Sequence, residues 1–413
     1  MLAQYLENTA FFRIFAPYMT KTAIIGGGAA GFFLAVCLKE MMPEMEVTIF
    51  ESGSKVLRKV AVSGGGRCNC TNTFEDIRDL KEVYPRGHRL MKRLMKGFSE
   101  RDAYEWFERH GVRLTIQEDH CVFPQSQDSQ TIIDCFLHFC NRYGVKIRTG
   151  KRIASLDALS DYDYICVTTG GQPRTEGLQW LADIGHEIIA PVPSLFTFNI
   201  EDAALRALMG TVTENTSVMI PGTSFRASGA LLITHWGMSG PAILRLSSYA
   251  ARHLAESSYQ SPLSINWISK KENEVTEELQ RLSIQYPQRQ LANIRPYDLP
   301  SRLWSYLLSK SLGEKAEKRW GELGKKDLHR LVNTLTNDNY TIHGRSAFKE
   351  EFVTCGGISL NSINSNTLES RHRPHLYFAG EVLDIDGVTG GFNFQAAWTT
   401  AHAVARAIVA AAF

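Results

Sequence analysis

The chain has 413 residues, of which 44% are hydrophobic and 21% charged, and its 45 basic and 43 acidic side chains leave a formal net charge of +2. This composition is that of an ordinary globular protein, and it excludes collagen-like, wholly disordered and disulfide-scaffold classes. Because the basic excess is so small, composition gives no case for bulk binding of nucleic acid or a membrane surface. We therefore expect a small molecule as the partner.

The apolar runs are short, and the longest, such as residues 29–38, have well under the roughly 18 residues that a membrane-spanning helix needs. Residues 1–19 are interpreted as an N-terminal extension that lacks the basic start of a signal peptide, with Met19 a candidate natural start. The eight cysteines show no C-x-x-C pair and no zinc-ligand spacing. We expect no metal site, reduced thiols and a cytoplasmic location.

The N-terminal third alternates strands and helices. Residues 22–25 predict a strand, which runs through a glycine turn into a helix at 32–41 and a second strand at 46–50. Residues 99–102 have the form of a capping box, and the helix that they begin should end at Gly111. Further elements of this kind are predicted at 130–143 (helix), 145–149 and 164–167 (strands). This alternation is typical of a doubly wound sheet.

The predicted secondary structure then changes twice along the chain. Residues 191–270 hold short segments rich in Thr, Ser, Val and Phe, which predict a β-rich domain, and residues 271–345 predict helices. Glycine turns and a βα pattern return in residues 346–413. We therefore predict an α/β fold whose first domain consists of residues 20–190 plus 346–413, with the two middle segments inserted into it.

A dinucleotide fingerprint, G-x-G-x-x-G, follows the first predicted strand and opens a helix. Its glycines allow a tight turn and close approach of a pyrophosphate, while Glu51, twenty residues beyond Gly31, can accept hydrogen bonds from ribose hydroxyls. The residues predicted to bind the cofactor here are Gly26, Gly28, Ala29, Ala30, Gly31 and Glu51. The fingerprint alone serves NAD and FAD equally.

A second half-site near the C-terminus favours FAD, because FAD is an extended cofactor that stays bound. A buried-strand pattern at 376–379 ends in Gly-acid, and the terminal helix opens soon after, where its N-terminus can face a ring that becomes anionic on reduction. The residues predicted to bind FAD here are Gly380, Glu381, Asp384, Gly391, Phe392 and Asn393. Thr169 and Gly170, after the strand at 164–167, are expected nearby.

Residues 63–72 form a third segment suited to a ligand. Three consecutive glycines let the backbone pass flat against a ring or phosphate, and the polar residues after them supply donors. The predicted contacts are Gly64, Gly65, Gly66, Arg67, Cys68 and Asn69. A redox pair of Cys68 with Cys70 is an alternative, but a Cys-x-Cys ring is strained, so free thiols are the favoured interpretation.

These motifs resemble, in order, those of the YhiN/BaiN-like flavoproteins, a family of aminoacetone oxidase-type and NAD(P)/FAD-dependent oxidoreductases. The matching segments are the fingerprint and residues 63–69, 122–126, 234–241, 379–384 and 390–395. The resemblance implies a glutathione-reductase-like FAD domain interrupted by an inserted β-barrel and a helical domain, which would cover the flavin. The chain departs from the family pattern at Leu57, where Gly is common, and at Cys70 and Cys121.

Two further features are open to more than one interpretation. His235 could donate a proton to a substrate beside the flavin, although a structural histidine at a domain junction is the favoured interpretation. Residues 81–101 carry basic side chains interleaved with apolar ones at helical spacing, which indicates an amphipathic helix with a solvated basic face. A phosphate-bearing substrate, NADPH or RNA is the alternative partner for that face.

The sequence thus predicts an FAD-dependent oxidoreductase that moves hydride equivalents between a small organic substrate and FAD. Because the insertion contains no second G-x-G-x-x-G, NAD(P)H as electron donor would have to bind transiently. One alternative is an oxidase or dehydrogenase that does not use NAD(P)H. Another is a tRNA-associated flavoprotein, for which the basic helix is the support.

Overall fold

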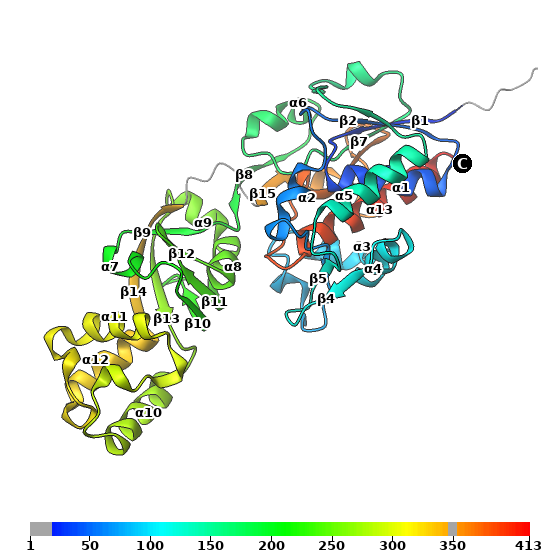
Figure 1. Ribbon diagram of the computed structural model, residues 1–413. Helices are drawn as coiled ribbons and strands as arrows, with labels where there is room; N and C mark the ends of the chain where they lie inside the picture. Colours follow the sequence, from blue (N-terminus) through cyan, green and yellow to red (C-terminus); the bar gives the residue numbers. More distant parts are fainter. Residues whose placement is uncertain (1–18, 346–352) are drawn as a thin grey trace, which may run out of the picture.

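The computed structural model describes residues 19–345 and 353–413, so the expected N-terminal extension lies almost wholly outside the described residues. The described chain forms two lobes, of which one is a Rossmann-type domain (Figure 1). Its five-stranded sheet has the order β16-β7-β1-β2-β6, and every pair in it is parallel. These strands are β1 (Lys21–Ile25), β2 (Glu46–Phe50), β6 (Lys146–Arg148), β7 (Tyr164–Val167) and β16 (Leu376–Phe378). Because β16 pairs with β7, both ends of the chain build one sheet, which confirms the predicted fold class.

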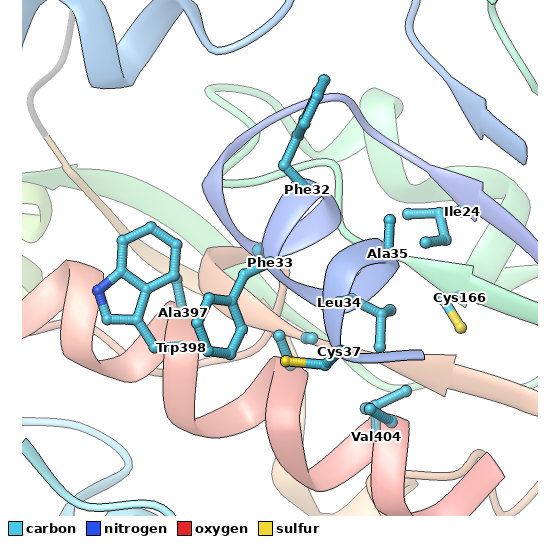
Figure 2. Packing of buried hydrophobic residues seen from close by; sticks show 14 of the residues in the cluster. Ile24, Phe32, Phe33, Leu34, Ala35, Cys37, Cys166, Ala397, Trp398 and Val404 are labelled. Atoms are coloured by element: carbon cyan, nitrogen blue, oxygen red, sulfur yellow. The ribbon is translucent and has the colours of Figure 1, made fainter. Parts of the chain in front are cut away.

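The helix after β1 is the buried centre of this lobe. Helix α1 (Ala29–Met41) packs against α13 (Phe392–Ala411) and α5 (Gln130–Arg142). The ring of Phe33 lies 5.2 Å from that of Trp398 on α13 and 4.6 Å from that of Trp106. Figure 2 shows Phe33 of α1 beside Trp398 of α13. A helix that is apolar on nearly all sides needs such cover, so α13, the C-terminal helix, completes the core of the domain.

A small antiparallel sheet, which the sequence analysis did not predict, lies beside this core, with the order β3-β5-β4. Its strands have only two to four residues, too few for a clear period-two pattern. The elements are β3 (Thr71–Asn72), β4 (Leu114–Ile116), β5 (Cys121–Pro124), α2 (Arg58–Val62), α3 (His88–Leu94) and α4 (Glu100–Arg109). The capping box is confirmed, because Ser99 and Asp102 bond each other's backbone N–H at the start of α4.

The second lobe is a closed six-stranded barrel with the order β10-β11-β12-β9-β14-β13. Closure leaves no strand edge unpaired, which suits strands this short and irregular. Its elements are β9 (Phe198–Ile200), α7 (Ala203–Arg206), β10 (Val212–Met219), β11 (Arg226–Ile233), β12 (Gly237–Ser239), α8 (Pro241–Tyr249), α9 (Ala251–Glu256), β13 (Gln260–Asn266) and β14 (Asp338–Arg345). Strand β14 falls in the segment 271–345 that was expected to be helical.

Three helices are inserted between the last two barrel strands: α10 (Glu272–Gln285), α11 (Ser301–Leu312) and α12 (Lys325–Thr336). They lie at the end of the barrel remote from the Rossmann lobe (Figure 1). The expectation that the helical part covers the flavin is therefore wrong, and the part of the insertion that contacts the Rossmann lobe is α8 and α9. No helix among the described residues is both long and apolar enough to cross a membrane.

The two lobes are connected by a pair of antiparallel strands. Strand β8 (Ile188–Ser194), preceded by α6 (Gln179–Ala182), leads out of the Rossmann lobe, and β15 (Val353–Ile358) leads back into it. Because the two connections are paired with each other, they form a single ribbon between the lobes.

Candidate cofactor site

The turn between β1 and α1 uses its three glycines in different ways. A Cβ on Gly26 would lie 2.4 Å from the carbonyl oxygen of Thr168, and one on Gly31 would lie 2.1 Å from that of Gly26. Gly26 also has a φ of +118°. By contrast, no heavy atom of the described chain is within 4 Å of a Cβ built on Gly28. The first and third glycines are therefore required by backbone packing, whereas the second leaves space for a ligand.

The start of α1 offers backbone donors to that space. Gly28 is the N-cap and has no side chain to bond the free N–H groups, and the first turn contains no acidic residue. The first turn of α1 itself thus contributes no negative charge at the place where the fingerprint predicts a pyrophosphate. Gly380 closes the other side, since its Cβ would lie 2.9 Å from the Cβ of Ala30.

Glu51, at the end of β2, is held toward this turn. Its Oε2 accepts a hydrogen bond from the backbone N–H of Gly27 at 2.9 Å, and its Oε1 accepts one from the N–H of Gly53 at 2.7 Å. The side chain is half-buried. Its Oε1 also accepts from the Ser52 hydroxyl at 3.2 Å, and its Oε2 can accept a further bond. This is the position from which a carboxylate can hold ribose hydroxyls.

The loop of residues 63–69 is the second part of the site. Gly64, Gly65 and Gly66 have φ values of +56°, +69° and +85°, a region that favours glycine. Within the described residues, nothing lies within 4 Å of a Cβ on either Gly65 or Gly66. Arg67 braces the loop, because its Nε donates to the Gly64 carbonyl at 3.2 Å and its guanidinium lies 4.3 Å from the centre of the Phe123 ring. The glycine backbone thus faces open space.

Asn69 joins this loop to the N-terminus of α13. When its amide group is oriented so that both polar atoms find partners, the side-chain oxygen accepts from the N–H of Gly391 at 3.2 Å and the nitrogen donates to the Thr71 carbonyl at 2.8 Å. Gly391, with a φ of +89°, can pack there only as glycine, because a Cβ would lie 2.2 Å from the Thr71 oxygen. Residues 324 positions apart also meet directly, since Thr71 Oγ1 donates to Gln395 Oε1 at 2.6 Å. The two predicted flavin segments therefore form one surface.

Glu381 and Thr169 lie where β16 and β7 end. Glu381 accepts from the backbone N–H of Thr354 at 2.8 Å and from Lys59 Nζ at 2.9 Å. The hydroxyl of Thr169 is buried and has no hydrogen-bond partner among the described residues. Since a Cβ on Gly26 would lie 2.8 Å from the Cα of Thr169, this orphaned hydroxyl stands beside the fingerprint turn. A bound polar ligand would satisfy it.

Three predicted site residues use their side chains elsewhere. Asp384 forms an ion pair with Arg252 of α9, at 3.1 Å. Asn393 donates to the carbonyl of Gly387 at 2.9 Å and accepts from its N–H at 2.8 Å, so its amide fixes the loop before α13. Cys68 is completely buried, which leaves only its backbone for a ligand. A pattern of spacing places such residues near a site but does not reveal which neighbour each side chain bonds.

Cys68 and Cys70 are not joined by a disulfide in this structure. The sulfur atoms of Cys68 and Cys70 are 4.0 Å apart, and both residues are free and buried. Burial raises the pKa of the Cys70 thiol well above its usual value, which disfavours the nucleophilic thiolate. Among the described residues there is no cluster of three or more side chains suited to a metal ion.

His235 lies in the barrel lobe, in the turn between β11 and β12. Its side chain is exposed, and its ring packs edge-on against that of Trp236, at 4.0 Å between centroids. Helix α8 begins a few residues further on, at Pro241. No hydrogen bond or ring contact recorded in the described part of the chain joins His235 to the glycine turn, the 63–69 loop or α13.

Sequence reasoning missed the role of α2, which lies between the two glycine loops. Leu57, its N-cap, is buried and has a φ of +55°, a conformation that costs a non-glycine residue about 1 kcal/mol or more. A glycine at this position, as the resemblance implies for the family pattern, would avoid this cost. The N–H of Leu57 donates to the Gly27 carbonyl at 2.8 Å. This bond joins the β1–α1 turn to α2, the helix that carries Lys59. In the sequence, the departure from the family pattern at Leu57 was the signal that could have drawn attention to α2.

Together these groups fit an extended dinucleotide. The glycine turn, the free start of α1 and Glu51 suit the adenosine and pyrophosphate half, while residues 63–69 and the start of α13 offer a second surface for the ring half. The fold and site thus define an FAD-dependent oxidoreductase with a Rossmann-type cofactor domain. The chain belongs to the HI0933-like Rossmann-domain family, which matches residues 20–407.

Two curated proteins are similar to this chain over nearly its whole length. A protein from Escherichia coli named ribosomal RNA dihydrouridine synthase is 29% identical, covering 94% of this chain and 98% of its own. One from Clostridium scindens named 3-dehydro-bile acid delta(4,6)-reductase is 24% identical, covering 94% and 99%. Among solved structures, 3-ketosteroid delta1-dehydrogenase from Sterolibacterium denitrificans is 11% identical with a TM-score of 0.48, covering 95% of this chain and 100% of its own.

Proposed function

We propose that this protein reduces a carbon–carbon double bond conjugated to a carbonyl group in a small organic substrate, with NAD(P)H as the electron donor. The observation that carries the proposal is the docking of the 63–69 loop onto the N-terminus of α13. The first turn of α13 contains no acidic residue, so its positive end favours negative charge on a ring bound beside it. Bound FAD supplies a ring that accepts a hydride from one substrate and gives it to another.

The names of the relatives support this class of reaction. The Clostridium scindens protein is named a delta(4,6)-reductase of a 3-dehydro-bile acid, and the Escherichia coli protein a dihydrouridine synthase. Both names describe saturation of a double bond in a compound that also carries a carbonyl. The sequence contains no second dinucleotide fingerprint, so in this proposal NAD(P)H binds transiently at the same site as the acceptor.

A uracil in RNA is the second candidate substrate. Helix α3 packs against α13, and four exposed cations lie on it and on the turn that follows: Arg89, Lys92, Arg93 and Lys96. Exposed cations along one face can hold a phosphate backbone. The small-molecule substrate is nevertheless favoured, because the net charge is only +2 and Arg93 already bonds Ser365 at 2.6 Å. The buried free cysteines fit the proposed cytoplasmic location.

An anaerobic experiment tests the proposal. The FAD-loaded protein is mixed with NADH or NADPH, and the flavin absorbance is followed before and after addition of a 3-oxo-Δ4 steroid, the matched saturated 3-oxo steroid, or ribosomal RNA. We expect one nucleotide to bleach the flavin and only the unsaturated steroid to restore it, with a saturated product. Restoration by RNA alone would establish the second candidate. If neither nucleotide reduces the flavin, the proposal that NAD(P)H is the electron donor is wrong.

His235 is the residue that we propose as proton donor to the carbon of the double bond that does not receive the hydride. If it has this role, His235→Gln should slow reoxidation of the flavin by the unsaturated steroid and leave reduction by NAD(P)H unchanged. Equal reoxidation rates in the two proteins would show that the proton comes from another group or from water.

A further inference from the structure

The contacts between the lobes converge on one short segment of the insertion, the bend between α8 and α9. Tyr249 donates its hydroxyl hydrogen to the Glu82 carbonyl at 2.8 Å. Arg86 Nη1 donates to the carbonyl of Ser248 at 2.7 Å, and Arg252 pairs with Asp384 at 3.1 Å. These bonds bring residues 248–252 against two segments of the Rossmann lobe, residues 82–86 and 384–388.

Arg86 and Asp386 form the buried centre of this junction. Asp386 is completely buried, and both of its oxygens accept from the Arg86 guanidinium, one of them from Nε at 2.5 Å. Ser194, the last residue of the outgoing strand β8, donates to Asp386 Oδ2 at 3.0 Å. A planar guanidinium bound by a carboxylate on one side and a carbonyl on the other has one orientation, and so fixes the groups around it.

The same two segments hold the start of α13. The hydroxyl of Tyr84 donates to the carbonyl of Phe392 at 2.8 Å. Gly387, next to Asp386, is bonded through both its N–H and its carbonyl by the side chain of Asn393. The segments are also bonded to each other, since the N–H of Val388 donates to the Val83 carbonyl at 2.8 Å. One buried ion pair therefore lies between the bend of the insertion and the helix start that faces the cofactor.

We propose that Arg86, through its pairing with Asp386, is a positioning residue that fixes the orientation of the inserted lobe relative to the N-terminus of α13. A substrate held by the inserted lobe is thereby placed at a constant distance from the flavin ring. Only this kinetic consequence rests on the proposed function. The orientation itself is a property of the protein without substrate.

Two variants test the role of Arg86 in the FAD-loaded protein. Arg86→Lys keeps the charge but loses the two-sided geometry of the guanidinium. The double variant Arg86→Met with Asp386→Leu replaces the buried pair by apolar side chains, which keeps the fold intact where a single change would leave a buried charge unpaired. The control is Arg101→Gln, because Arg101 is exposed and pairs with Glu105 on the surface of α4.

The first readout is small-angle X-ray scattering. We expect the wild-type protein and the Arg101→Gln control to give the same scattering curve, and both Arg86 variants to give a larger radius of gyration or a broader distance distribution at unchanged FAD content. The second readout is steady-state reduction of the steroid, in which kcat/KM should fall roughly tenfold or more in both variants because misplacement is costly to catalysis. Reduction of the flavin by dithionite should not change.

Wild-type scattering from both Arg86 variants would overturn the proposal whatever their activity. If the wild-type protein reduces no unsaturated ketone, the proposed function fails but the scattering comparison still decides the role of Arg86. A double variant that regains the scattering curve and the kcat/KM of the wild type would also overturn it, because any buried contact would then suffice.

Discussion

The two glycine-rich loops of the Rossmann lobe differ in what makes glycine necessary. In the β1–α1 turn, Gly26 and Gly31 lie against backbone atoms of the protein itself, at 2.4 and 2.1 Å from a Cβ. In the 63–69 loop, Gly65 and Gly66 face open space and are distinguished by positive φ. The first loop is shaped by the core behind it, whereas the second is shaped by its own conformation and by the ligand that it would meet.

Because of this difference, substitutions in the two loops can distinguish effects on folding from effects on FAD binding. Substitution of a glycine that touches the core should damage the protein with or without cofactor. Substitution of a glycine that faces open space should be tolerated by the apoprotein and be felt when FAD binds. Gly28 is informative because it belongs to the first loop in sequence but resembles Gly65 in its surroundings.

The largest effect is expected for Gly31→Ala. The added methyl group would overlap the Gly26 carbonyl, and neither α1 nor the turn can move freely because α1 is packed between α5 and α13. We expect a loss of about 4 kcal/mol or more in the free energy of unfolding of the apoprotein, measured by urea denaturation. An apoprotein as stable as the wild type would show that the turn is more pliable than the contacts indicate.

Gly28→Ala should separate binding from folding. Its φ of −94° is available to alanine, and the new methyl group meets no atom of the described chain. The apoprotein should unfold within about 0.5 kcal/mol of the wild type. The methyl group would occupy the space of the pyrophosphate, so we expect FAD to bind at least about tenfold more weakly, or about 1.4 kcal/mol, in a calorimetric titration. Unchanged affinity would place the pyrophosphate elsewhere.

Gly65→Ala should destabilise the protein less than Gly31→Ala and weaken FAD binding less than Gly28→Ala. Its φ of +69° costs alanine about 1 kcal/mol, which the apoprotein loses whether or not FAD is present. Any further loss of FAD affinity measures how closely the ligand approaches this loop. A variant with the expected loss of stability and the FAD affinity of the wild type would remove Gly65 from the site.

Lys59→Met should have a small effect on stability. Lys59 is more than half exposed in its ion pair with Glu381, so we expect a change of no more than about 1 kcal/mol in the free energy of unfolding. If the pair orients Glu381 toward the cofactor, FAD affinity should fall even though stability does not. Glu46, paired with Lys146 far from both loops, gives the control variant Glu46→Gln.

The sequence was sufficient to predict features that depend on local spacing. The βαβ unit, the capping box at Ser99 and the return of the chain to the first domain all follow from periodicity and turn residues. It could not show what depends on distant partners. The bonds of Asp384 to Arg252, of Asn393 to Gly387 and of Asn69 to Gly391 join parts of the chain that no local pattern relates.

The inserted lobe shows the same limit at the scale of a domain. The alternation of short β segments predicted its β-rich character. Strand β14 was not predicted, because three helices separate it in sequence from its partner β13, which ends more than seventy residues earlier. Those helices lie remote from the Rossmann lobe because of the way the barrel closes. Their amphipathic patterns alone do not predict this position.

If one FAD molecule contacts both glycine loops and the start of α13, amide hydrogen exchange measured with and without FAD will show it. On addition of saturating FAD to the apoprotein, we predict slower amide exchange in residues 26–31, 63–69 and 391–395 together, with no change in α10, α11 and α12. Protection confined to residues 26–31 would contradict the account, because a dinucleotide would then bind at the first loop without reaching α13.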